Sequence, residues 1–221
     1  VVLGGFVPET VRTIIGATFP NASVFEHYSL AEVFGGASKA PGAGAFVSDA
    51  HVVAEVLDDE DAATPVGSIG ELTLTELFPF VQVQPLIRYR TGDLVQRHRC
   101  DEPGRVAFRW WGRRSGSFQR ADGAWILGEG PMIDALLGEP VVARSVHRGH
   151  LAVATSTIAM PVAQRVYDPL DGTALEIGVR CTPWMRNGDI DALLARLGQA
   201  VTPDARPGDL VLNLHRADDR R

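Results

Sequence analysis

Apolar residues recur three and four positions apart in two segments, which is the spacing of one face of an α-helix. The first segment covers residues 8–19, and its opening proline is tolerated in the first turn of a helix. The second covers residues 189–201, where Asp189 or Gly188 is a candidate N-cap. A third, shorter helix is predicted at residues 131–137.

Short apolar runs bounded by glycine, proline and polar residues predict the strands. These runs occupy residues 1–3, 24–25, 52–57, 69–75, 87–89, 105–111, 125–127, 141–146, 151–154, 175–179 and 211–214. The stretch from Gly35 to Gly44 is rich in glycine, alanine, serine and proline, and it predicts a loop. The opening strand, helix, strand order is that of an α/β unit, whose ligands gather at the carboxyl ends of the strands. The later runs predict a small antiparallel sheet or barrel.

The segment Gly112-Arg113-Arg114-Ser115-Gly116 contains two glycines that permit a bend, and it predicts a domain boundary. We expect residues 1–111 to form one domain of α/β class with a small antiparallel β subdomain. Residues 112–221 are then a smaller α+β domain.

The charge and hydropathy of the chain exclude some functions. A net charge of −6 gives no whole-chain basic field for nucleic acid, and the arginines between residues 105 and 120 are explained by pairing within the fold. We therefore expect no nucleic-acid partner. No apolar run reaches the roughly 18 residues that span a bilayer, and no signal peptide opens the chain, so a cytoplasmic protein with no membrane association is expected.

The basic residues are almost all arginine, because Lys39 is the only lysine in the sequence. Two cysteines far apart in the chain indicate neither a disulfide framework nor a metal site. His147 and His150 lack a third ligand at zinc-like spacing and are read as a solvated turn. The acidic run at residues 58–61 is read as a solvated loop.

Asp93 is the strongest candidate for binding chemistry. A nucleotide site needs a carboxylate that accepts hydrogen bonds from ribose hydroxyls, and an ionised acceptor makes the stronger bond. Asp93 follows Thr91 and Gly92, which predict a tight turn that would present its carboxylate. The alternative is that Asp93 ends a strand and caps backbone amides of that turn.

Several motifs in order resemble the adenylate-forming superfamily, within it the phenylacetate–coenzyme A ligase-like branch. The most specific are Gly70-Glu71-Leu72-Thr73-Leu74-Thr75 and Pro85-Leu86-Ile87-Arg88-Tyr89-Arg90-Thr91-Gly92-Asp93. Gly4-Gly5, Tyr28-Ser29-Leu30-Ala31-Glu32 and Gly112-Arg113-Arg114-Ser115 complete the set. The resemblance runs from Gly4 to about Leu137, and it implies the rear portion of a large nucleotide-binding domain followed by a small lid domain that moves about residues 112–116.

The resemblance also implies roles for individual residues. Asp93 would hold the ribose, Tyr28 would stack on adenine, and Glu32 would ligate Mg²⁺ bridging the ATP phosphates. Arg113 would help orient the nucleotide and take part in catalysis with Glu32. Three further residues, Gly4, Gly5 and Ser29, would contribute to the nucleotide site, and His27 would border the acyl pocket.

This sequence departs from the family pattern at Ser29 and Ala31, where relatives carry glycine and threonine, at Phe6, where they often carry a polar residue, and at Ser115, where they carry an acidic one. The phosphate loop that precedes Gly4 in the family is absent, so we expect a fragment or a split subunit. The lid lysine is absent as well, and an arginine would have to replace it. The candidates are Arg206, Arg216 and Arg220.

The implied reaction is ATP-dependent activation of a small carboxylic acid as an acyl-adenylate, followed by transfer to the thiol of coenzyme A or of a phosphopantetheinyl carrier. The implied cofactors are ATP and Mg²⁺, and the implied partners are the acid, the missing upstream portion or a carrier protein. Two alternatives remain open. One is a degenerate module that binds nucleotide or a protein without catalysing adenylation, and the other is a ligase with a replaced lysine that acts in thiol transfer.

Overall fold

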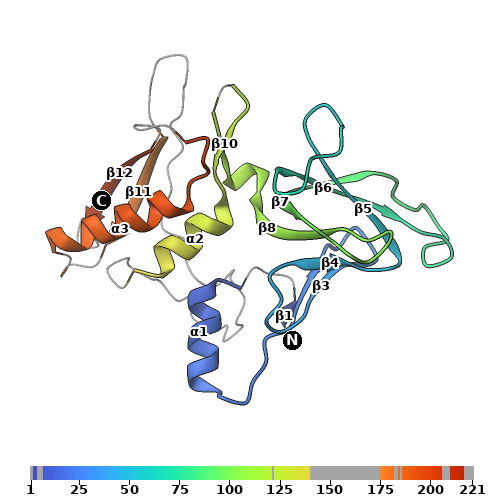
Figure 1. Ribbon diagram of the computed structural model, residues 1–221, viewed down its shortest axis with the longest axis horizontal. Helices are drawn as coiled ribbons and strands as arrows, with labels where there is room; N and C mark the ends of the chain where they lie inside the picture. The colour runs from blue at the N-terminus through green and yellow to red at the C-terminus, as the bar shows by residue number, and fades with distance from the viewer. Residues whose placement is uncertain are drawn as a thin grey trace. The chain divides into compact units, whose positions relative to one another are not determined.

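The structure is a computed structural model, and it describes residues 2–3, 7–120, 122–139, 175–181, 184, 186–205 and 210–216. The chain divides into two compact units (Figure 1). Val1–Val7 and Val11–Ser115 form the first unit, and Pro8–Thr10 with Gly116–Arg221 form the second. The expected division at residues 111 and 112, with its assignment to a large domain and a lid, stays a prediction. In the described part of the chain, no helix is long and apolar enough to cross a membrane.

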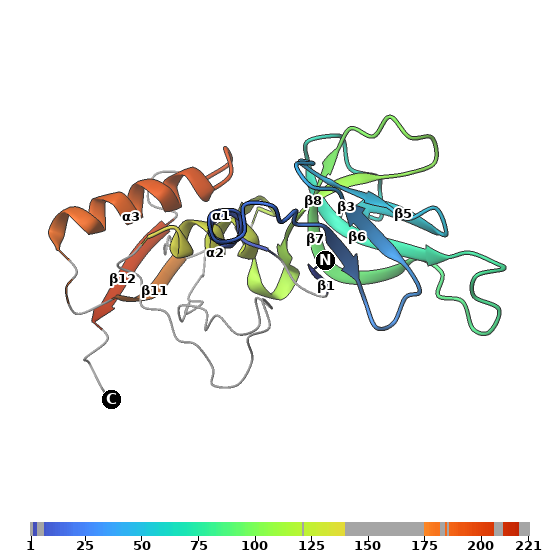
Figure 2. The same cartoon turned by 90° about the horizontal axis from the view of Figure 1, so that it is seen from below.

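An eight-stranded sheet makes up most of the first unit (Figures 1 and 2). Its strands are β1 Val2–Leu3, β2 Glu26–Ser29, β3 Gly36–Lys39, β4 Phe46–Ser48, β5 Val52–Leu57, β6 Ile69–Glu76, β7 Tyr89–His98 and β8 Ala107–Arg113. The order across the sheet is β1-β2-β3-β4-β8-β7-β6-β5, with β1 parallel to β2 and all other neighbours antiparallel. The helix α1, Glu9–Thr18, connects β1 to β2.

The sheet is strongly curled. β2 and β7 are four steps apart in the strand order, which would separate them by roughly 19 Å in a flat sheet. Nevertheless the hydroxyl of Tyr28 on β2 lies 2.6 Å from the carboxylate of Asp93 on β7. The interior of the curl is filled by an apolar core to which Phe46, Phe108 and Leu72 contribute. Tyr28 meets the rings of Phe46 and Phe108 edge to face, with centroids 6.5 and 5.8 Å apart.

The predicted α/β class with an antiparallel β portion is confirmed, while several boundaries were wrong. The expected loop from Gly35 to Gly44 contains strand β3, because Gly36 and Ala37 are small residues that fit closely beside β2 in the sheet. The expected strand at residues 24–25 is β2, two residues later. The expected strand at residues 87–89 is only the approach to β7, which begins at Tyr89.

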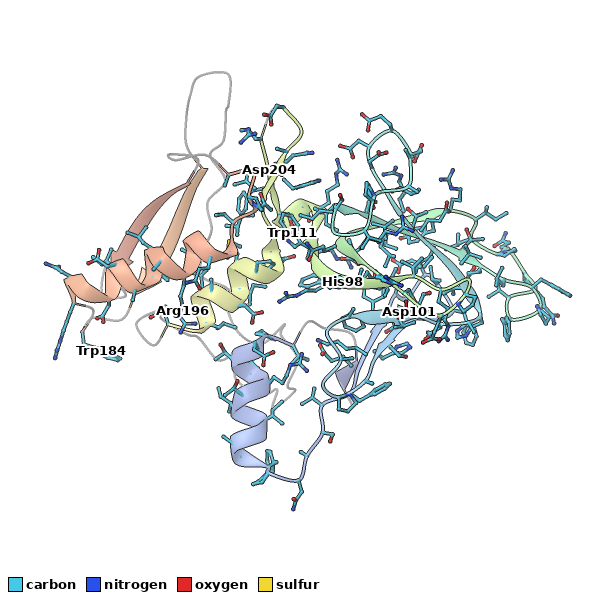
Figure 3. The ribbon with its side chains drawn as sticks, viewed as in Figure 1. His98, Asp101, Trp111, Trp184, Arg196 and Asp204 are labelled. Carbon is cyan, nitrogen blue, oxygen red and sulfur yellow. The ribbon has the colours of Figure 1, made fainter. Side chains whose placement is uncertain are left out.

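The second unit contains smaller elements. They are η1 Arg114–Gly116, which begins in the first unit, β9 Phe118–Gln119, β10 Trp125–Leu127, α2 Glu129–Leu137, β11 Leu175–Cys181, α3 Asn187–Ala200 and β12 Leu210–Arg216. β9 pairs with β10 antiparallel, and β11 pairs with β12 parallel. The helices α2 and α3 pack together, and Arg196 of α3 forms an ion pair with Glu139 just after α2 (Figure 3). The expected strands at residues 141–146 and 151–154 lie outside the described residues.

The start of α3 differs from the prediction. The N-cap is Arg186, and neither Gly188 nor Asp189 occupies that position. Asp189 instead stands in the first turn, where its carboxylate accepts a hydrogen bond of 2.8 Å from the backbone N–H of Arg186. Leu193 and Leu197 are buried, whereas Leu194 is exposed.

Candidate functional site

Asp93 lies on a bulge inside strand β7. Between the paired positions Glu71–Leu94 and Thr73–Arg90, β7 advances four residues while β6 advances two. The surplus is taken up at residues 91–93, and Gly92 supplies the positive φ of 73° that this backbone requires. The expected turn is therefore a bulge within a continuous strand, and it directs the carboxylate of Asp93 into the curled sheet, where the residue is 2% exposed.

A second irregularity, in β8, brings two further side chains to Asp93. Arg113 is paired with Asp93 and Trp110 with Val95, so β8 carries one extra residue, Trp111, between these positions. In a regular strand, residues three apart would point to opposite faces. The extra residue cancels this alternation, and both Trp110 and Arg113 reach the same carboxylate.

Two hydrogen-bond donors and one ion-pair partner surround the carboxylate of Asp93. The Tyr28 hydroxyl donates to Oδ2 at 2.6 Å, and the Trp110 indole Nε1–H donates to Oδ1 at 3.2 Å. The Arg113 Nε also lies 3.2 Å from Oδ1, and its Nη1 donates to the carbonyl of Thr91 at 2.9 Å. The carboxylate is thus contacted by one residue of β2, Tyr28, and by two residues of β8, Trp110 and Arg113.

The protonation of this group follows from its burial. Burial raises the pKa of the Asp93 carboxyl above its usual value, and the hydrogen bonds from Tyr28 and Trp110 and the charge of Arg113 offset only part of this effect. Burial, and then the nearby charge of Asp93, raise the pKa of the Tyr28 phenol far above its usual value. Tyr28 therefore remains a protonated donor at neutral pH.

The backbone on either side of Asp93 is held by buried polar contacts. The Thr91 hydroxyl donates to the carbonyl of Leu72 at 2.8 Å and accepts from the Asp93 N–H at 3.1 Å. The Glu71 carboxylate, 7% exposed, accepts from the Gly92 N–H at 3.1 Å and pairs with Arg90 at 2.9 Å. Glu71 and Thr91 therefore fix the bulge that presents Asp93.

Comparison with known proteins finds this fold only among solved structures. No family model and no curated relative matches the sequence. An anthranilate coenzyme A ligase in complex with anthranoyl-AMP shares the fold with a TM-score of 0.57 and 15% identity, over 96% of this chain and 40% of that chain. O-succinylbenzoate coenzyme A synthetase from Bacillus subtilis, in complex with ATP and magnesium ion, shares it with a TM-score of 0.57 and 15% identity, over 98% of this chain and 42% of that chain. For the amide bond synthetase McbA from Marinactinospora thermotolerans the TM-score is 0.57 and the identity 18%, over 98% of this chain and 42% of that chain.

The chain has the fold of the C-terminal part of an adenylate-forming enzyme. It spans about two fifths of the length of the solved structures that it matches. At these identities the likeness shows the fold alone.

Within this adenylate-forming fold, the structure brings Tyr28, Asp93 and Arg113 together, as expected. Their roles toward a nucleotide stay predictions. Ser29 and Glu32 are exposed at the end of β2 and in the bend that follows it. Among the described residues, no group of three histidine, cysteine or acidic side chains could hold a metal ion, so the Mg²⁺ role of Glu32 also stays a prediction. Gly4 and Gly5 lie outside the described residues.

The side chain of His27 lies on the opposite face of β2 from the side chain of its neighbour Tyr28. Successive side chains of a strand alternate between faces, so His27 points away from the face that carries Tyr28 and Asp93. Its Nε2 lies 3.3 Å from the carboxylate of Asp49, which also accepts a hydrogen bond from Ser38. The expected role of His27 at an acyl pocket stays a prediction.

The acidic run at residues 58–61 is largely exposed, as expected, and it also makes specific contacts. Asp59 pairs with Arg114 at 2.8 Å, and Asp61 pairs with Arg90 at 2.5 Å. Both arginines also approach Glu71, so the run belongs to the ionic network beneath Asp93.

Trp110 is the site residue that the sequence analysis missed. Its neighbour Trp111, labelled in Figure 3, is buried, and the two tryptophans look alike in the sequence. Trp110 reaches Asp93 because of the bulge in β8, and no residue pattern predicts that bulge. The sequence signal that was available is the pair of tryptophans next to the predicted hinge, and it does not say which of the two contacts Asp93.

Proposed function

We propose that this chain belongs to the adenylate-forming enzymes and that Asp93 binds the ribose of ATP or of an acyl-adenylate. The observation that carries the proposal is a carboxylate, in a residue that is 2% exposed, held by two hydrogen bonds and an ion pair. It lies in a fold shared with structures that contain ATP or an acyl-adenylate. A buried, oriented carboxylate is a strong acceptor for the hydroxyls of a ribose because its hydrogen bonds are charge-assisted.

Arg113 and Glu32 have supporting roles in this proposal. The Arg113 guanidinium is half exposed beside Asp93 and would help to orient the nucleotide. Glu32 is exposed and would supply one of the few protein oxygens that Mg²⁺ needs. Tyr28 donates to Asp93 through its hydroxyl, and its ring, which meets Phe108 edge to face, would stack on the adenine.

The proposed reaction is activation of a small carboxylic acid as an acyl-adenylate, with Mg²⁺ on the phosphates. Transfer to the thiol of coenzyme A or of a phosphopantetheinyl carrier would follow. The similar structures include coenzyme A ligases and an amide bond synthetase, so the acceptor is decided by experiment. We further propose that residues 1–111 are the C-terminal part of the large domain and residues 112–221 the lid, as in the phenylacetate–coenzyme A ligase-like branch.

One observation favours a second function, that of a nucleotide-binding module without adenylation activity. Charge developing at the α-phosphate is best stabilised by a compact ammonium group. The only lysine, Lys39, pairs with the buried carboxylate of Glu26 at 3.0 Å and lies over the ring of Phe46. Its ammonium group therefore stabilises the sheet and does not take part in the chemistry at the α-phosphate.

Two measurements separate these functions. Binding of ATP and AMP is measured by calorimetry, and acid-dependent exchange of labelled pyrophosphate into ATP is measured across aryl, alkyl and amino acids. Binding together with exchange supports the ligase. Binding without exchange for any acid supports the binding module, and the absence of nucleotide binding contradicts both.

A further inference from the structure

Arg113, which is proposed to orient the nucleotide, stands at the very end of its strand. Its pairing with Asp93 is the last of the β7–β8 ladder. The other neighbour of β8 is β4, which pairs with Ala107 and Phe108 at the beginning of β8. In the described part of the sheet, Arg113 therefore has a neighbouring strand on one side alone. Strand ends open more readily than strand centres, so the position of Arg113 depends on what holds the residue after it.

The residue after it, Arg114, is held by two carboxylates of the same unit. Its Nη1 lies 2.8 Å from Oδ1 of Asp59 and 3.5 Å from Oε2 of Glu71. The first unit ends one residue later, at Ser115. Two consecutive arginines thus attach the end of β8 to the rest of the first unit, Arg113 through Asp93 and Arg114 through the other two acidic side chains.

Asp59 is a fixed anchor, because the turn that carries it is folded around its own backbone. The carboxylate of Asp58 accepts hydrogen bonds from the N–H groups of Glu60 and Ala62, at 3.1 and 2.8 Å. Arg90 of β7 donates to the carbonyl of Asp58 at 2.9 Å and so ties the turn to the sheet. The turn therefore presents the carboxylate of Asp59 in a defined place.

We propose that Arg114 is a positioning residue for Arg113, and that its ion pair with Asp59 keeps Arg113 beside Asp93 when a nucleotide binds. This inference rests on the proposed nucleotide-binding function of the site. It makes a prediction of unusual sign for Asp59. Loss of a negative charge close to the site of an anionic ligand should strengthen binding by electrostatics alone. Loss of the positioning contact should weaken it.

The test is calorimetric titration of ATP into the parent chain, Asp59→Asn and Glu60→Gln. Glu60 is exposed and follows Asp59 in the same turn, so the two variants make the same change in charge. We expect Asp59→Asn to bind ATP about 3- to 10-fold more weakly than the parent, because a displaced Arg113 loses part of a charge-assisted contact. Glu60→Gln should bind within about 2-fold of the parent, or more tightly. Asp59→Glu keeps the carboxylate and should recover most of the affinity.

A dependence on Arg113 separates positioning from a general loosening of the fold. In an Arg113→Met background, Asp59→Asn should change the affinity for ATP by less than about 2-fold, because the residue that Arg114 positions is gone. A loss as large in that background as in the parent would overturn the positioning role. If Arg113→Met binds ATP too weakly to be titrated, the opposite signs expected for Asp59→Asn and Glu60→Gln decide.

The remaining outcomes separate this inference from the proposed function. If the parent binds ATP and Asp59→Asn binds it equally or more tightly, the positioning role is wrong and the nucleotide-binding function stands. If the parent does not bind ATP, both are contradicted. Urea denaturation shows whether each variant is folded, and Arg114→Gln, judged by its dependence on Arg113, replaces Asp59→Asn if that variant does not fold.

Discussion

Asp93 and Arg113 are paired directly across the β7–β8 ladder, and the Arg113 Nε lies 3.2 Å from Oδ1 of Asp93. Asp93 reaches this position through the bulge at Gly92, and Arg113 shares a face with Trp110 through the extra residue Trp111. Two local irregularities in neighbouring strands therefore build the site. Irregularities of this kind re-aim side chains without ending the strand.

The bond between Tyr28 and Asp93 gives the first prediction. Tyr28→Phe removes a donor from a buried carboxylate and should lower the free energy of unfolding by about 1.5–3 kcal/mol. Urea denaturation measures the change. Tyr89→Phe, in a tyrosine packed against the same core, is the control, and an equal loss in both variants would show that the Asp93 contact contributes nothing specific.

Glu71 is expected to stabilise the bulge. Glu71→Gln weakens the pairs with Arg90 and Arg114 and should cost about 1–3 kcal/mol, a figure that allows for the partial exposure of both arginines. Asp101→Asn is the control, because Asp101 and Arg99 are both 86% exposed and their pair should not affect stability measurably. Similar denaturation midpoints for the two variants would contradict this expectation.

Gly36 is required for close packing of β2 and β3. A Cβ at this position would lie 2.0 Å from the carbonyl oxygen of Tyr28, which is backbone and cannot move aside without disturbing the site. Gly36→Ala should therefore cost at least about 2 kcal/mol and weaken nucleotide binding. A Cβ at Gly44 would meet nothing within 4 Å, so Gly44→Ala should stay within about 0.5 kcal/mol of the parent.

The raised pKa of Asp93 predicts a pH dependence. Between the ordinary carboxyl value of 3.8 and the higher folded value, the folded state binds more protons than the unfolded state. The contribution of Asp93 to stability is therefore present in full below pH 3.8 and is lost as the pH rises through its folded pKa. The free energy of unfolding of the parent should fall relative to Asp93→Asn over that interval and then level off. A difference that rises with pH would contradict the raised pKa.

Much of the fold followed from periodicity in the sequence. Residues 52–57 and 69–75 alternate or run apolar between turn residues, and both are strands of the sheet. Gly36 to Lys39 could not be predicted as a strand, because small residues signal a loop unless a neighbouring backbone demands close approach. Tertiary packing overrode local composition there.

The acceptor of the site, Asp93, could be predicted from the sequence, but the residues that contact it could not. The Thr91-Gly92-Asp93 tract singled out Asp93, and the proximity of Tyr28 followed only from a resemblance. The contact from Trp110 depends on the strand register, which is a long-range property of the sheet. A residue pattern cannot state on which face of a bulged strand a tryptophan falls.

The most direct test of ribose binding is calorimetric titration of ATP into the parent chain, Asp93→Asn and Glu55→Gln. Asp93→Asn keeps the shape of the side chain and removes its charge, whereas Glu55 lies in β5 and pairs with Arg88 away from Asp93. We predict saturable binding to the parent and to Glu55→Gln, and at least about 10-fold weaker binding to Asp93→Asn. Equal affinities for all three proteins would contradict the assignment of Asp93 as the ribose acceptor.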